Sequence, residues 1–137
     1  MLLNNKIYTM GGVAGTCTTC YVNGNFWEYD VAGDTWATRS PGLQATAWAV
    51  AIKGQVDYTD SIYVLGGLGS ESRVQVYVPS TSSWVVSADM QTPRYDAAGV
   101  IWGGEMYVIG GHDFSGPVLA VNESFNPNRV LYLYTKN

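Results

Sequence analysis

The chain has 137 residues, of which 47% are apolar types and only 13% are charged. This balance excludes a disordered chain, and the length suits one domain with a core of its own. The net charge is −4, and the seven Lys and Arg residues are scattered, which argues against nucleic acid as a partner.

Aromatic residues and glycines are abundant, with ten Tyr, five Trp, three Phe and sixteen Gly. This mixture favours strands joined by tight turns, so we expect an all-β fold. No apolar run approaches the roughly 20 residues that cross a bilayer, and the N-terminus lacks the pattern of a signal peptide. We therefore expect a soluble chain without a membrane partner, in a compartment that the sequence leaves open.

A repeated pattern predicts the strands in chain order, and each unit of it reads as four strands. The motif Tyr-x-x-Gly-Gly occurs three times, and an aromatic pair seven residues apart follows each copy. In the first unit, residues 1–40, strands are expected at 1–3, 6–10, 26–31 and 35–38. The first of these is short. Its diglycine is Gly11 and Gly12, and its aromatic pair is Tyr29 and Trp36.

The second unit spans residues 41–90, with strands expected at 46–53, 61–65, 73–78 and 84–88. Its repeat residues are Gly66, Gly67, Tyr77 and Trp84. The third unit spans residues 91–137, with strands expected at 97–102, 105–109, 118–125 and 130–135. Its repeat residues are Gly110, Gly111, Phe125 and Tyr132. Paired glycines permit positive φ where a strand stops abruptly, and the two aromatics of each unit can pack across a turn.

These spaced features resemble the kelch repeat, and the resemblance covers nearly the whole chain. It implies a β-propeller in which each repeat is one four-stranded blade, with strands a to d from the inside outward. Blade three departs from the family pattern with Phe125 and Tyr132 in place of Tyr and Trp. Thr46 stands in blade two where Arg94 stands in blade three.

Three blades are fewer than the 4 to 8 with which propellers close. The resemblance therefore predicts a fragment with an exposed apolar sheet face at each end. We expect a homodimer, in which blade three of each chain packs on blade one of the other to complete a six-bladed ring. The alternative is a truncated piece of a longer propeller.

The resemblance places peptide binding at the end of the propeller that carries the d–a and b–c connections. That end would include the links 40–44 and 90–96 and the loops 13–24, 69–72 and 112–116. A set of polar and aromatic residues is expected to line it: Arg94, Tyr95, His112, Arg73 and Trp48. Packing between blades is the competing role for the same residues.

Two motifs contain residue types that can bind a metal or act in catalysis. Cys17 and Cys20 have the spacing of half a zinc site or of a redox pair, but the sequence offers one histidine and no further cysteine. A disulfide or free thiols are the other readings, and we expect neither a metal nor another cofactor. His112 beside Asp113 could form a general base, although neighbours on a strand point to opposite sides.

The sequence therefore favours a noncatalytic module that binds a peptide or protein, and less readily a sugar. One alternative is a carbohydrate-active enzyme similar to the sialate mutarotases among kelch-like propellers, using Arg94, Tyr95 and His112. The other is a propeller fragment without an independent function.

Overall fold

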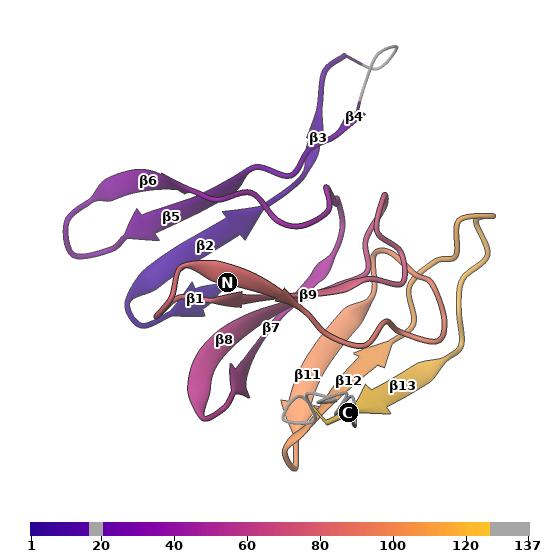
Figure 1. Cartoon of the computed structure of the whole chain (residues 1–137). Coiled ribbons are helices and arrows are strands. Elements are labelled where there is room, and N and C mark those ends of the chain that lie inside the picture. The colour runs from indigo at the N-terminus through magenta and orange to yellow at the C-terminus, as the bar shows by residue number, and fades with distance from the viewer. Residues whose placement is uncertain (17–20, 127–137) are drawn as a thin grey trace, which may run out of the picture.

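A computed structural model describes residues 1–16 and 21–126 of the chain. These residues form thirteen strands and no helix, so the prediction of an all-β fold is confirmed for this part. Three antiparallel sheets pack next to one another in chain order, with sheet two between sheets one and three (Figure 1). Consistent with this content, the described residues include no helix long and apolar enough to cross a membrane.

Sheet one follows the predicted strands closely, with the order β1-β2-β5-β6. Its strands are β1 (Leu2–Leu3), β2 (Lys6–Met10), β5 (Phe26–Asp30) and β6 (Thr35–Arg39). The inner strand β1 has only two residues, as the sequence predicted. An apolar hollow of about 330 Å³ lies beside it, bordered by Met1, Met10 and Ile62 among others. The short strand therefore leaves part of the inner edge between sheets one and two unfilled.

Sheet two contains four strands in the order β10-β9-β8-β7. They are β7 (Val50–Val56), β8 (Thr59–Leu65), β9 (Val74–Val78) and β10 (Ser83–Val86). The inner strand was expected from residue 46, but it begins at Val50. The reason is local: Ala47 forms an isolated bridge with Leu68, and Trp48 adopts a φ of 53°, which interrupts the extended conformation.

Sheet three contains three described strands, β11 (Ala98–Trp102), β12 (Glu105–Ile109) and β13 (Asn122–Phe125). The strand expected from residue 118 begins at Asn122. The preceding residues are held in a loop, because Val118 bridges His112 and the Leu119 N–H donates to the Gly111 carbonyl at 2.8 Å. The fourth predicted strand, at 130–135, and its Tyr132 lie outside the described residues.

No sequence pattern predicted the two-stranded ribbon that extends from sheet one. Strands β3 (Val13–Ala14) and β4 (Tyr21–Val22) pair within the segment expected to be a b–c loop. Figure 1 shows this ribbon projecting beyond the sheets, on the side where β2 ends. Two-residue strands are too short to show an alternating pattern, so the sequence could not reveal them.

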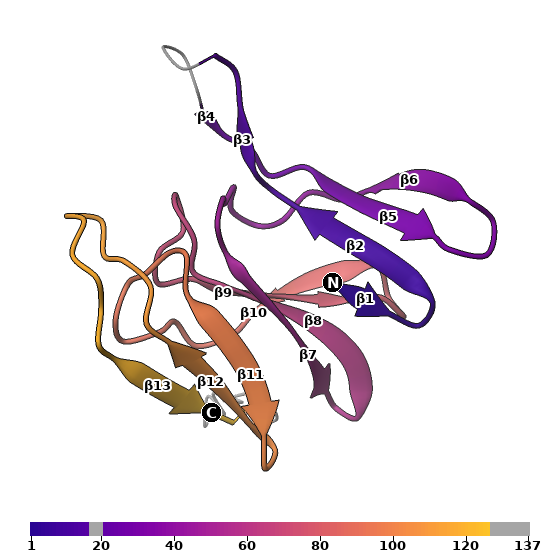
Figure 2. The ribbon, with the colours of Figure 1, turned by 180° about the vertical axis from the view of Figure 1, so that it is seen from behind.

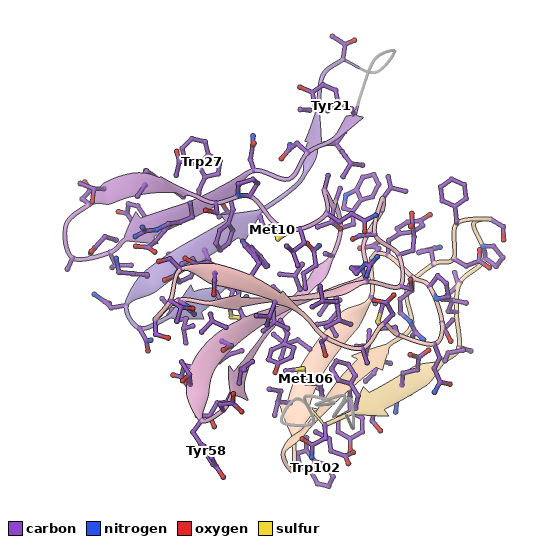
Figure 3. The ribbon with its side chains drawn as sticks, in the orientation of Figure 1. Met10, Tyr21, Trp27, Tyr58, Trp102 and Met106 are labelled. Atoms are coloured by element: carbon purple, nitrogen blue, oxygen red, sulfur yellow. The ribbon has the colours of Figure 1, made fainter. Side chains whose placement is uncertain are left out.

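The core consists of two apolar layers, one on each side of sheet two. Between sheets one and two lie Leu3, Tyr8, Phe26, Ile62, Val64 and Tyr77. Between sheets two and three lie Val50, Ile52, Tyr63, Leu65, Val74, Val76, Met90, Met106 and Val108. Strand β9 is therefore buried along its whole length. In Figure 3, Met10 and Met106 mark these two layers.

The aromatic pairs of the first two units lie across their turns, whereas Tyr132 of the third pair lies outside the described residues. Tyr29 lies directly opposite Trp36, and Tyr77 opposite Trp84, with ring centroids 5.0 and 5.2 Å apart. Both glycines of all three diglycines have positive φ. At Gly67 (φ 92°) a Cβ atom would lie 2.7 Å from the Ala47 carbonyl oxygen, so this position needs both the conformation and the small size of glycine.

Candidate binding site

The candidate site lies at one end of the three sheets, where the links between sheets meet the loops that follow the diglycines. Figure 1 shows the β6–β7 and β10–β11 links at the same end as the β3–β4 ribbon. The β8–β9 and β12–β13 loops also lie at this end, while the tight turns β7–β8 and β11–β12 lie at the other. We call the first of these the link end.

Thr46 and Arg94 occupy equivalent places in the two links. Each backbone carbonyl accepts a hydrogen bond from the second glycine of the preceding sheet, Gly12 N–H to Thr46 at 2.8 Å and Gly67 N–H to Arg94 at 2.9 Å. Each side chain donates to the first glycine carbonyl of its own sheet. The sequence equivalence of these two residues therefore reflects one structural task, which is to join neighbouring sheets.

Arg94 is enclosed, with 1% of the residue exposed. Its guanidinium donates to the carbonyls of Thr92, Gly110 and Val121 at 3.1 to 3.2 Å and to the Glu123 carboxylate at 2.8 Å. The Arg94 side chain thus packs between sheets two and three. A ligand at the link end would meet other groups first.

Glu123 completes this arrangement from strand β13. Its carboxylate accepts the backbone N–H groups of Gln91 and Thr92 at 3.0 and 2.7 Å, besides the Arg94 guanidinium. Partial burial opposes ionisation of Glu123, but the hydrogen bonds from Thr92 and Gln91 and the charge of Arg94 outweigh it, and its pKa is lowered. Glu123 was not among the predicted site residues, because the only feature that marks it in the sequence is its place two residues before Phe125.

Three of the predicted residues come together as an aromatic cluster, which we define as Trp48, Tyr95 and His112. Tyr95 stacks on the His112 ring at a centroid distance of 5.7 Å and an interplanar angle of 21°. Tyr95 also contacts Trp48, with the two ring centroids 6.0 Å apart. Backbone hydrogen bonds of 3.0 and 2.9 Å between Tyr95 and His112 fix the two rings in register.

Trp48 is 56% exposed, and its backbone is in the left-handed region. The equivalent residue of the next link is Asp96, with a φ of 55°. Asp tolerates this conformation because its short side chain can bond locally, whereas Trp gains nothing comparable from it. The position therefore holds a large exposed ring at a site that favours a small polar residue.

His112 and Asp113 do not form an acid–base pair. The His112 Nδ1 lies 3.1 Å from the Gly116 carbonyl oxygen. The Asp113 carboxylate instead accepts from the backbone N–H groups of Ser115 and Gly116 and from the Ser115 hydroxyl. Asp113 therefore closes the turn that presents His112, and the cluster offers stacking surfaces.

The remaining predicted residues either lie away from the aromatic cluster or fall outside the residues that the structure describes. Arg73 is half-exposed and forms an ion pair with Asp89 at 3.8 Å. Cys17 and Cys20 lie outside the described residues. Within the described ranges, no group of three or more His, Cys, Asp or Glu residues could hold a metal ion. Two exposed aromatics of this end were missed, Tyr21 on the ribbon and Phe114 in the β12–β13 loop, because each stands alone in a loop-like segment.

Comparisons with known proteins agree with the repeated pattern. A model of the kelch motif matches residues 93–129. Kelch-like protein 35 of Mus musculus is 31% identical over 101 residues, which are 72% of this chain and 16% of that protein. Kelch-like protein terF of Aspergillus terreus is 29% identical over 124 residues, 82% of this chain and 27% of that protein.

A likeness in structure extends further than the likeness in sequence. The solved "Structure of YjhT" superposes with a TM-score of 0.73 at 14% identity, over 95% of this chain and 51% of that one. The chain therefore spans about a sixth to about a quarter of the two curated relatives above, and about half of the solved chain. At this identity the match concerns the fold alone.

Proposed function

Because the chain belongs to the kelch-repeat family, we propose that it is a noncatalytic binding module whose link end holds a peptide or protein. The observation that carries this proposal is the exposed Trp48 ring in the aromatic cluster. Large rings that are fixed in place but open to solvent are the usual anchors of binding surfaces. Loops and links on a rigid sheet scaffold are where such anchors are normally placed.

The strained backbone at Trp48 supports the same conclusion. Holding a bulky residue in the left-handed region costs of order 1 kcal/mol, and such strain is concentrated at functional positions. Packing against Tyr95 and at the edge of the apolar hollow between sheets one and two covers less than half of Trp48, since 56% of the residue is exposed. A binding role explains why this position carries Trp while the equivalent position carries Asp96.

The binding surface would belong to a ring larger than one chain. We propose three blades per chain and a homodimer that completes six, because propellers close with 4 to 8 blades. One face of sheet one and one face of sheet three leave large apolar residues open to solvent, which supports a partner on both sides.

No observation favours the carbohydrate-active alternative. That reading needed Arg94 beside Tyr95 and His112 in an open funnel, but the guanidinium of Arg94 is enclosed and fully engaged with protein groups. His112 and Asp113 are likewise engaged in separate contacts.

The test is selection of a peptide display library on the immobilised chain, followed by measurement of the enriched peptide on two variants. Trp48→Asn removes the ring and suits the left-handed backbone, so it should abolish binding without lowering the free energy of unfolding. Tyr58→Asn, at the opposite end, is the matched control and should bind as the wild type does. Enrichment of no peptide, or equal binding by Trp48→Asn, would contradict the proposal.

A further inference from the structure

Each sheet has two faces, which the strand register defines because directly opposed residues point to the same side. In sheet two, face A carries Ile62, Val64, Gln75, Tyr77 and Trp84. Face B carries Ile52, Tyr63, Leu65, Val74 and Val76. Aligning the diglycines transfers the same two faces to sheets one and three.

Both internal junctions join unlike faces. Face B of sheet one, with Tyr8 and Phe26, packs on face A of sheet two, with Tyr77 and Trp84. The Phe26 ring meets Tyr77 at 4.6 Å and Trp84 at 5.0 Å. Face B of sheet two then packs on face A of sheet three, which carries Met106, Val108 and Phe125. The rule within the chain is therefore B on A.

Within residues 1–16 and 21–126, this rule leaves one face of each kind uncovered. Sheet one exposes its face A, with Leu2, Ile7, Trp27, Tyr29 and Trp36. Sheet three exposes its face B, with Ala98, Val100, Trp102, Tyr107 and Ile109. Figure 3 shows Trp27 and Trp102 at opposite ends of the molecule, and Figure 2 shows sheets one and three as its two outer layers.

We propose that these two uncovered faces dock on each other between two copies of the chain, so that face B of sheet three in each copy covers face A of sheet one in the other. This proposal rests on the self-association proposed above and names the surfaces that make it. The contact continues the two internal junctions, with the same kind of residue on each side. The chain covers 51% of a solved chain of the same fold, so two copies supply the length of one such chain.

One substitution in the repeat supports a junction between separate chains. Gln75 and Glu123 hold equivalent places on face A, and both bond the backbone of the link that enters their sheet, at Gln44 and at Thr92. Sheet one has Trp27 at this place, and the ring is exposed. The face A that would meet another molecule thus replaces a polar link-binding group with apolar surface.

The internal junction also predicts which residues meet. Tyr77 and Trp84 contact Tyr8 at the first junction, directly or through Phe26. Their counterparts on the open face A are Tyr29 and Trp36, and the counterpart of Tyr8 on the open face B is Tyr107. We therefore expect Tyr29 and Trp36 of one copy to lie against Tyr107 of the second copy.

The experiment measures association by sedimentation velocity on the full chain and on two charged variants. Trp36→Asp alters face A, Val100→Asp alters face B, and both side chains are about half exposed, so the fold of one chain should survive. Each variant alone should associate at least about 100-fold more weakly than the wild type, because every junction would bury an unpaired carboxylate. Tyr58→Asp, on neither face, is the control and should associate normally.

Mixing the two variants is the decisive arm. A Trp36→Asp copy keeps an intact face B and a Val100→Asp copy keeps an intact face A, so the mixture should form a one-to-one dimer through one good junction. Association by either variant alone at wild-type strength would overturn the face assignment, as would failure of the mixture to associate. A monomeric wild type would overturn the self-association itself, and none of these three results bears on peptide binding at Trp48.

A milder variant covers the case in which an Asp variant does not fold. Trp27→Gln introduces the residue type that sheet two has at Gln75, and it should weaken association about tenfold while leaving the thermal unfolding of the monomer unchanged. Unchanged association of Trp27→Gln together with an intact fold would contradict the proposal.

Discussion

At the scale of single residues, Glu28 is the most consequential charged group of sheet one. Its carboxylate is buried and accepts from Arg39 Nε at 3.0 Å and Nη2 at 2.9 Å, and it also pairs with Lys6. The hydrogen bond from Arg39 is the largest cause of the shift that lowers the pKa of Glu28 to about 2, and Lys6 and Tyr8 add to it against the opposing effect of burial. The charged form of Glu28 therefore stabilises the folded chain.

This arrangement predicts the pH dependence of stability. A carboxylate whose pKa is depressed by folding contributes stability that is present above its unfolded value and is lost as the pH falls toward its folded value. Glu28→Gln should lower the free energy of unfolding by about 2 kcal/mol at pH 7, with the difference shrinking between about pH 4.5 and pH 2. Urea unfolding at a series of pH values measures it. A difference independent of pH would contradict this account of Glu28.

Arg94 and Glu123 provide a second prediction at this scale, because sheet two performs the same task with the neutral residues Thr46 and Gln75. Arg94→Thr should destabilise the fold by about 3 kcal/mol, since it leaves the Glu123 carboxylate partly buried without its cation. Adding Glu123→Gln should recover about 1 kcal/mol or more, because the double variant restores the neutral pair of sheet two. Urea unfolding of both single variants and the double variant decides, and strict additivity would show that the two residues act independently.

At the scale of elements, the diglycines end the b strands by a close approach of backbones. Gly67→Ala should cost about 3 kcal/mol, because it combines an unfavourable positive φ with a collision at the Ala47 carbonyl. Gly103→Ala is the matched control, since Gly103 has a φ of 62° but no neighbour within 4 Å of an added Cβ. The control should cost only about 1 kcal/mol. Thermal unfolding compares them, and equal losses would mean that conformation alone matters.

The strands that the sequence predicted well are those whose residues repeat. Strands β2 and β12 have the predicted bounds, because in each a short apolar run that contains the repeated Tyr ends at a diglycine. The predicted starts of β7 and β13 were too early by four residues, since the link before β7 and the loop before β13 contain apolar residues that form single bridges and not strands. Periodicity reports which residue types alternate, and it does not report where a tertiary bridge interrupts them.

The candidate site was predictable only in part, for a similar reason. The repeat accounts for the pairing of Tyr95 with His112, because Ala47 and Leu68 form the equivalent bridge one sheet earlier. It does not account for the contact with Trp48, whose equivalent in the next link is Asp96. The repeat does not predict the burial of Arg94. This burial depends on hydrogen bonds to the carbonyls of Gly110 and Val121 and to Glu123, and no sequence spacing indicates these partners. Side-chain direction within a link is settled by packing, not by pattern.

At the scale of the whole molecule, the chain contains three similar sheets, and its two outer sheets expose different faces, face A of sheet one and face B of sheet three. Sheet two is covered on both faces, whereas sheets one and three are covered on one. In repeat proteins each unit gains stability from its neighbours, so the outer sheets should gain from a partner as sheet two does. We therefore expect the thermal midpoint of unfolding to rise with protein concentration, as association linked to folding requires. A midpoint independent of concentration would indicate that the outer faces stay uncovered.

The most direct measurement of the central claim is the mass of the wild-type chain in solution by sedimentation equilibrium at micromolar concentration. We expect a closed dimer, with twice the mass of the chain and no larger species, because each copy offers one face A and one face B and two copies use all four. A monomer at this concentration, or an open series of higher oligomers, would contradict it.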